Sequence, residues 1–84
     1  MKKVHFIGIG GIGLSAIARY LKNDGFDISG SDIYSTPLTK SLEKEGIKVY
    51  IPQKGENIKD VDVVVYTAVV KEDNEELKAA KDKK

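Results

Sequence analysis

This 84-residue sequence has little of what metal sites, thiol chemistry and nucleic-acid binding require: it contains no cysteine, a single histidine and almost no net charge. The lack of cysteine excludes a disulfide framework, a thiol nucleophile and a cysteine-ligated metal. With one histidine and no cluster of carboxylates at ligand spacing, we expect no metal site. The 14 Lys and Arg nearly cancel the 13 Asp and Glu, so the basic surplus of a nucleic-acid-binding protein is also missing.

Long apolar runs are lacking too. The run near the N-terminus is short, follows Lys2-Lys3 and is interrupted by His5 and by glycines, which fits neither a signal peptide nor a membrane span. The phosphate-loop pattern G-x-x-x-x-G-K-[ST] does not occur, so no ATP site is expected. The length fits one domain, residues 1–84, which buries about 60–65% of its unfolded surface. We expect a cytoplasmic domain with no membrane or nucleic-acid partner.

The most informative stretch is Val4–Ser15, VHFIGIGGIGLS, in which Gly8, Gly10 and Gly13 match G-x-G-x-x-G. In this motif the first glycine permits a tight turn after a strand, and the second lets a phosphate approach the backbone. The third lets the following helix pack closely on the strand. The helix N-terminus presents unpaired N–H groups to an anion. The stretch therefore predicts a phosphate-binding turn between a strand and a helix.

An acidic residue follows at the separation that nucleotide-binding folds use. Asp32 lies nineteen residues after Gly13, at the end of a second strand-like run. In such folds an acid at this place accepts hydrogen bonds from a ribose hydroxyl. We therefore predict a nucleotide site, in which Asp32 contacts the ribose or the base. The alternative is a purely structural glycine turn, with Asp32 capping a turn.

Apolar periodicity and turn signals divide the chain into alternating strands and helices. Strands are expected at 3–9, 26–31, 47–51 and 61–67, and helices at 11–24, 37–46 and 73–81. The polar stretch 53–60 is expected to be a loop with one helical turn. This order predicts a Rossmann-like three-layer α/β/α fold with a parallel sheet in strand order 3-2-1-4. The first and fourth strands are apolar on both faces and are expected to be central, and the third to be an edge strand.

Local signals predict the ends and faces of the helices. Gly25 is suited to the left-handed position after the first helix. Thr36-Pro37 is a typical N-cap followed by proline at the first helical position. Asp73 and Glu76 have the spacing of a capping box for the last helix. One apolar stripe is expected on the first helix, formed by Leu14, Ile17, Ala18 and Leu21.

Three polar or aromatic residues allow more than one interpretation. His5 lies inside a strand, where a lone histidine is usually packed and hydrogen-bonded, although its position near the glycine turn leaves a functional role open. The hydroxyl of Ser15 either bonds to the local backbone or contacts a ligand. The ring of Tyr34 either packs at the rim of the site or stacks on a base.

The predicted topology brings three segments together. The carboxyl ends of neighbouring parallel strands meet at one edge of a sheet, and ligands bind in the crevice there. The glycine turn follows the first strand, Ser31-Asp32 ends the second, and Thr67-Ala68 ends the fourth. These segments, distant in sequence, are therefore expected to line one crevice.

The same residues resemble a known family. The blocks His5–Ser15 and Gly30–Asp32 are similar to the N-terminal domain of the Mur ligases, of the type that joins L-alanine to UDP-N-acetylmuramate. Residues Thr67–Glu75, TAVVKEDNE, resemble the fourth-strand motif of that domain, a small polar pair followed by an Asp-Asn-Pro-Glu-like helix start. The resemblance extends over essentially the whole chain.

The resemblance implies a part of a three-domain cytoplasmic enzyme of peptidoglycan synthesis, an acid–amino-acid ligase that uses ATP and magnesium. In such enzymes the first domain holds the UDP part of the substrate, and the central and C-terminal domains carry the ATP site and admit the amino acid. By this resemblance the chain is an N-terminal UDP-sugar-binding fragment that binds no cofactor itself and is inactive alone. A fifth edge strand that family members have would be missing.

The resulting hypothesis assigns no catalytic residue and no metal ligand, and it places the diphosphate on the glycine turn. The residues expected to bind the UDP part are Gly8, Ile9, Gly10, Gly11, Ile12, Gly13, Ser15, Ser31, Asp32, Thr67, Ala68 and Asn74. Two alternatives remain at this point. One is a regulatory NAD-binding Rossmann module, because Asp32 suits NAD equally well. The other is a Rossmann-like piece that retains no ligand.

Overall fold

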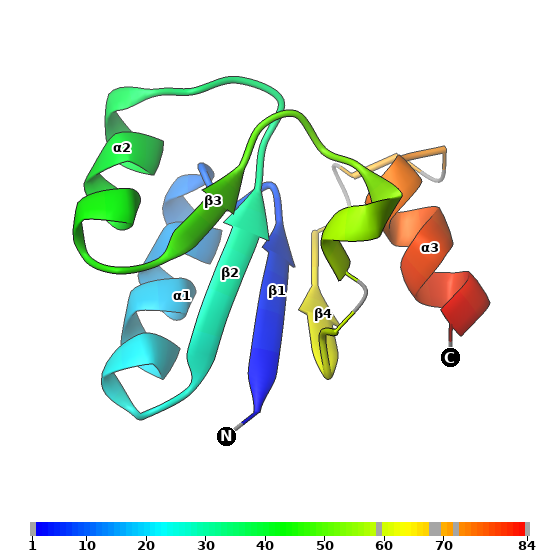
Figure 1. The fold of residues 1–84 in the computed structure, drawn as a ribbon. Helices are drawn as coiled ribbons and strands as arrows, with labels where there is room; N and C mark the ends of the chain where they lie inside the picture. Colours follow the sequence, from blue (N-terminus) through cyan, green and yellow to red (C-terminus); the bar gives the residue numbers. More distant parts are fainter. Residues whose placement is uncertain (1, 59, 68–69, 72, 84) are drawn as a thin grey trace.

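A computed structural model describes residues 2–58, 60–67, 70–71 and 73–83. Its elements alternate as predicted, and the bounds differ from the expected ones by a few residues. They are β1 (Lys3–Ile7), α1 (Ile12–Asn23), β2 (Asp27–Ser31), α2 (Pro37–Lys44), β3 (Lys48–Tyr50), a 3-10 turn η1 (Gly55–Ile58), β4 (Val63–Val65) and α3 (Glu75–Lys83). The sheet is parallel with order β3-β2-β1-β4 (Figure 1), which confirms the predicted topology.

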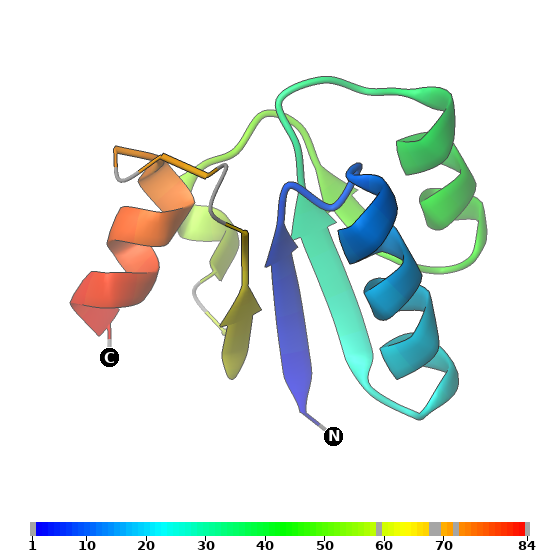
Figure 2. The same cartoon turned by 180° about the vertical axis from the view of Figure 1, so that it is seen from behind.

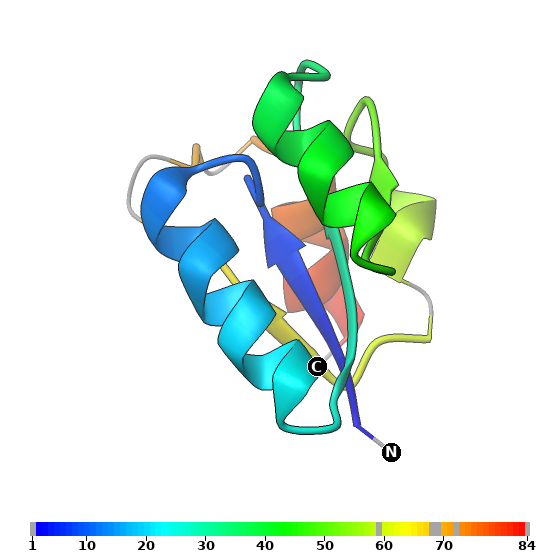
Figure 3. The ribbon, with the colours of Figure 1, turned by 90° about the vertical axis from the view of Figure 1, so that its left-hand side faces the viewer.

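Helices lie on both faces of this sheet. In the register of β1 and β2, Val4 pairs with Ile28 and His5 with Ser29, and alternate residues of a strand face opposite sides. The apolar side is covered by α1 and α2; in Figure 2, α1 lies in front of the strands and α2 lies to the right, beside β3. The polar side, with His5, is covered by α3 and η1, which pack on each other. Figure 3 shows α1 and the 3-10 turn on opposite sides of β1 and β2.

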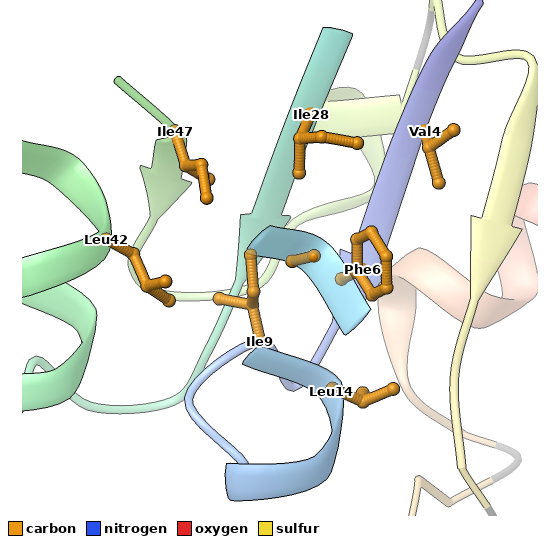
Figure 4. Packing of buried hydrophobic residues seen from close by; sticks show 8 residues of the cluster. Val4, Phe6, Ile9, Leu14, Ile28, Leu42 and Ile47 are labelled. Atoms are coloured by element: carbon orange, nitrogen blue, oxygen red, sulfur yellow. The ribbon is translucent and has the colours of Figure 1, made fainter. Parts of the chain in front are cut away.

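One apolar cluster fills the space between the sheet and the first two helices (Figure 4). Strands, helices and loops all contribute buried side chains to it, which are Val4, Phe6, Ile9, Leu14, Ala18, Ile28, Leu42 and Ile47. The prediction that Ile17 belongs to the buried stripe of α1 is wrong, because this residue is 48% exposed. The other predicted stripe residues face the core: Leu14 and Ala18 are buried, and the partly buried Leu21 packs against the cluster.

Ile9 has a central place in this cluster. It follows β1 in the glycine turn, and its side chain is fully buried against Gly30 of β2. A Cβ atom at Gly30 would overlap three atoms of Ile9. At Gly13, by contrast, a Cβ would meet nothing within 4 Å. The predicted role of the third motif glycine in close helix–strand packing is therefore wrong here, and close packing depends on Gly30 instead.

We expect Gly30→Ala to lower the free energy of unfolding by about 1–3 kcal/mol, because the added methyl overpacks the core beneath Ile9. Gly13→Ala is the matched control. It adds the same methyl in open space within a helix, so we expect it to be neutral or stabilising by up to about 1 kcal/mol. Urea unfolding of the two variants measures the difference, and equal midpoints would contradict the packing argument.

The predicted N-cap is confirmed for α2 but not for α3. Thr36 caps α2 as predicted: its side chain accepts from the amide of Thr39 at 3.2 Å. The predicted capping box of Asp73 and Glu76 is wrong. The cap of α3 is Asn74, whose side-chain oxygen accepts from the amides of Glu76 and Leu77 at 2.9 and 3.1 Å. Glu76 is fully buried and points to the sheet, where hydrogen-bond donors surround its carboxylate.

The two outer strands of the described sheet are β3 and β4. The edge position predicted for β3 is confirmed, but β4, expected to be central, pairs only with β1 among the described residues. Val63 of β4 is accordingly 37% exposed. Within the described residues, no helix has the length and apolar character needed to cross a membrane.

Candidate functional site

The glycine turn is fixed to the end of β2 by backbone hydrogen bonds. The amides of Gly8 and Ile9 both donate to the carbonyl of Ser31, each at 2.9 Å, and the amide of Gly11 donates to the carbonyl of Gly8 at 3.0 Å. Gly8 has a φ of +84°, in the left-handed region that favours glycine. The turn is therefore a rigid connection that ends at the N-terminus of α1.

Asp32 closes the turn from the side of β2. Its Oδ2 accepts from the amide of Gly10 at 2.8 Å, and its Oδ1 accepts from the amide of Ile33, also at 2.8 Å. A Cβ at Gly10 would press against Oδ2 of Asp32. The second motif glycine therefore makes room for this carboxylate, and the Gly10 amide is already used by the protein.

The backbone amides that remain available to an anion lie just after the turn, at the start of α1. Among the described residues, nothing accepts from the amides of Ile12, Gly13 and Leu14, the first three of α1. The N-cap residue Gly11 has no side chain to cap them, and the first turn contains no acidic residue. A 12-residue helix with an uncapped N-terminus offers an anion three N–H groups and the positive end of its dipole.

A cleft of about 630 Å³ opens beside this turn, at the carboxyl ends of the strands. Its lining comes from the glycine turn, the segment after β2, the loop after β3 and the segment before α3. The residues are Gly8, Gly10, Gly11, Asp32, Ile33, Tyr34, Thr36, Gln53, Val70, Lys71, Asp73 and Asn74. Among the described residues of this lining, Lys71 is the one cation, and Asp32 and Asp73 are the acids. Ligands of open α/β sheets bind at this edge.

The structure brings together part of the predicted site. Five of the predicted residues line the cleft: Gly8, Gly10, Gly11, Asp32 and Asn74. Ile12 and Gly13 are exposed beside it, at the start of α1. Thr67 is exposed and lies outside the lining, and Ala68 lies outside the described residues.

The side chains of three further candidates are directed away from the cleft. Ile9 is buried in the core. Ser15 is buried too, and its hydroxyl donates to the carbonyl of Ile12 at 2.9 Å, the local bond that was one of its two interpretations. Ser31 is fully buried and its hydroxyl donates to Glu76. Their contribution is to hold the turn and the start of α1 in place.

Sequence reasoning missed most of the cleft wall opposite the glycine turn. The cleft is also lined by Thr36, Gln53, Lys71 and Asp73, none of which the sequence analysis assigned to ligand binding. Among these added residues, Tyr34 is the one for which the sequence suggested a ligand contact, stacking on a base, whereas Thr36 and Asp73 were interpreted as helix caps. The available signal was topological, since each of these residues follows or precedes an element whose end lies at this edge of the sheet.

A second, smaller cavity of about 330 Å³ lies at the opposite end of the sheet. It is lined by the amino ends of three strands, with Lys3, Asp27 and Lys48, and by residues of η1. It is separated from the glycine turn by the length of the strands. Its described lining includes neither the glycine turn nor the first turn of an α-helix, so the larger cleft is the candidate site.

Beneath the cleft, Glu76 forms a buried network with His5. The Nε2 atom of His5 lies 2.9 Å from Oε1 of Glu76, and Nδ1 lies 2.8 Å from the hydroxyl of Ser29. Both His5 and Glu76 are fully buried. This confirms the packed, hydrogen-bonded interpretation of His5. The Oε2 atom of Glu76 accepts from Asn57 Nδ2 at 2.7 Å and from the Lys54 amide at 3.2 Å.

Burial raises the pKa of Glu76, but hydrogen bonds from His5, Ser31 and Asn57 outweigh it, so the pKa lies below its ordinary value of 4.5. The folded state therefore binds fewer protons than the unfolded chain. The stability contributed by this carboxylate is present well above pH 4.5 and is lost as the pH falls below that value.

We expect the difference in free energy of unfolding between wild type and Glu76→Gln to shrink as the pH falls from about 6 to about 3. Because glutamine does not titrate, the free energy of unfolding of Glu76→Gln should fall less steeply than that of the wild type as the pH is lowered. Urea unfolding at a series of pH values measures this, with Glu75→Gln as the control on an exposed neighbour. A gap between wild type and Glu76→Gln that is constant over this range would contradict the assignment.

The fold and the cleft define a class: Rossmann-like α/β proteins with a glycine turn and a free helix N-terminus at the carboxyl edge of a parallel sheet. Comparison with known proteins is more specific. Residues 3–84 match the Mur ligase family, catalytic domain. The chain belongs to the Mur ligase family.

Close relatives carry one name. The chain is 57% identical over 98% of its length to UDP-N-acetylmuramate–L-alanine ligase of Campylobacter jejuni strain 81-176, of which it covers 19%. It is 61% identical over 95% of its length to the protein of that name from Acetivibrio thermocellus, of which it covers 17%. The chain thus spans less than a fifth of the length of these relatives.

Solved structures agree in fold. The crystal structure of UDP-N-acetylmuramate-alanine ligase from Thermotoga maritima has a TM-score of 0.94 and 41% identity, over 99% of this chain and 19% of that one. A Neisseria meningitides UDP-N-acetylmuramate:L-alanyl-gamma-D-glutamyl-meso-diaminopimelate ligase has a TM-score of 0.88 and 33% identity, over 98% and 26%. The four-stranded fold is therefore that of one part of these ligases.

Proposed function

We propose that this chain binds the UDP part of UDP-N-acetylmuramate, as the N-terminal domain of an ATP-dependent UDP-N-acetylmuramate–L-alanine ligase in cytoplasmic peptidoglycan synthesis. The observation that carries the proposal is the uncapped start of α1 beside the cleft, where the amides of Ile12, Gly13 and Leu14 have no acceptor among the described residues. A diphosphate supplies acceptor oxygens of the right charge for these donors. The names of the relatives supply the substrate.

The rest of the nucleotide fits along the cleft. Asp32 keeps lone pairs beyond the two amides that it accepts from, because a carboxylate can accept about four hydrogen bonds. A ribose hydroxyl or a uracil N–H can therefore share it. Tyr34 is 74% exposed and lines the same cleft, so its ring is available to stack on the base. In this arrangement the glycine turn positions the ligand and supplies few of its bonds.

ATP and magnesium belong to other domains in this proposal. The sequence has no phosphate loop for ATP. Within the part of the chain that the structure describes, no three His, Asp or Glu side chains come together as metal ligands. We therefore assign the chain no catalytic step. The central and C-terminal domains of the same enzyme would be its partners.

NMR titration of the 84-residue chain tests the proposal. With UDP-N-acetylmuramate, we expect the largest amide shifts at Ile12, Gly13 and Leu14, because these N–H groups gain an acceptor. A smaller shift is expected at Ile33, next to Asp32. NADH is the comparison ligand, since its diphosphate suits the same helix end. The proposal is wrong if the UDP-sugar leaves these amides unchanged, or if NADH shifts them at lower concentration.

A further inference from the structure

One wall of the cleft depends on a residue that does not reach the cleft. Lys71, Asp73 and Asn74 form the wall that precedes α3. Asn74 caps that helix and also donates through Nδ2 to Gln53, another lining residue. The position of this wall is therefore tied to the position of the first turn of α3.

The first turn of α3 is held to the rest of the chain by Glu76. Four donors from different segments converge on its carboxylate: His5 of β1, Ser31 of β2, Asn57 of η1 and the amide of Lys54. Each oxygen accepts two of these bonds, so the carboxylate is fully used. It is also fully buried. None of these donors lines the cleft.

Ser31 connects this network to the glycine turn. Its hydroxyl donates to Glu76, and its carbonyl accepts from the amides of Gly8 and Ile9 on the opposite side of the cleft. Ser31 thus holds two walls of the cleft: its side chain is linked through Glu76 to the α3 wall, and its backbone carbonyl holds the glycine turn. Loosening Glu76 frees the α3 wall while the backbone bonds still hold the glycine turn.

We propose that Glu76 is a positioning residue for nucleotide binding: it holds the cleft wall formed by Lys71, Asp73 and Asn74 against the glycine turn, so that UDP-sugar affinity depends on it without direct contact. This inference rests on the proposed function. A neutral glutamine keeps the shape of the side chain but offers one oxygen in place of two, and its hydrogen bonds lack charge assistance. The wall should loosen while the core cluster remains packed.

The experiment compares Glu76→Gln with Glu75→Gln, which changes the exposed neighbour in the same way. For each folded variant, calorimetry gives the affinity for UDP-N-acetylmuramate, and hydrogen exchange is read amide by amide. For Glu76→Gln we expect about tenfold weaker binding. We also expect about tenfold faster exchange of α3 amides, with α1 amides near their wild-type rates. Glu75→Gln should change neither.

Several outcomes overturn the inference. Wild-type affinity in Glu76→Gln would show that the wall does not need this carboxylate. Equal acceleration of α1 and α3 amides would show a general loss of stability and no positioning. If Glu76→Gln does not fold, Asn57→Ala, which removes one donor of the four, is measured instead, and the same changes are expected at smaller size. Lack of binding by the wild type would instead refute the proposed function.

Discussion

Replacing Glu76 with alanine is expected to lower the free energy of unfolding by about 3–5 kcal/mol, because several buried or half-buried donors lose their acceptor at about 1–3 kcal/mol each. For a domain of this size the total stability is on the order of 4–13 kcal/mol. The variant should therefore be largely unfolded at mild denaturant concentrations, and at the lower end of that range even in buffer.

The size of this effect follows from the hydrogen-bond donors that lose their acceptor when the carboxylate is removed. His5, Ser31 and Asn57 all lose an acceptor, and His5 is fully buried beside the vacated position. A buried donor without a partner costs about 1–3 kcal/mol. Water entering the cavity can satisfy some of them, so the losses do not simply add. The same removal detaches α3, whose first turn loses its link to β1 and β2.

Urea unfolding monitored by circular dichroism measures this loss. Glu75→Ala is the control because Glu75 is exposed, and we expect it to change stability by no more than about 0.5 kcal/mol. If Glu76→Ala unfolded at the wild-type midpoint, the network of His5 and Glu76 would not contribute to stability, and the inference about the cleft wall would lose its physical basis.

Much of the fold was predictable because its signals are local. The glycine turn, Thr36-Pro37 and Gly25 mark element ends through the backbone geometry that those residue types permit. The order of strands follows from alternating β and α segments and the right-handed crossover. The position of Asp32 at the end of β2, beside the turn, follows from the same topology.

What the sequence did not reveal depends on contacts between distant residues. Glu76 and His5 are 71 residues apart, and the spacing of Glu76 from Asp73 suggested a local capping role instead. Gly30 belongs to no glycine motif, yet it is the glycine against which Ile9 packs. The motif also does not predict which amides remain without an acceptor. The Gly10 amide donates to the carboxylate of Asp32, so the free donors are those in the first turn of α1.

The position of those free donors leads to the second large effect. Gly13→Asp is expected to weaken binding of UDP-N-acetylmuramate by about 100-fold or more, about 2.7 kcal/mol. A carboxylate in the first turn of α1 would lie near the amides that we assign to the diphosphate and would repel its negative charge. The folded chain should not suffer, since a Cβ at Gly13 meets nothing within 4 Å and an acid near a helix N-terminus is stabilising.

Opposite effects on binding and stability make this variant informative. Thermal unfolding should show a melting temperature equal to or above that of the wild type, while calorimetry shows the loss of affinity. Gly13→Asn is the matched control, nearly identical in shape but neutral, and we expect it to keep most of the affinity. If Gly13→Asp bound the UDP-sugar as tightly as Gly13→Asn, the diphosphate would not lie at the start of α1. The diphosphate would then have to lie elsewhere along the cleft, whose lining also contains the ammonium group of Lys71.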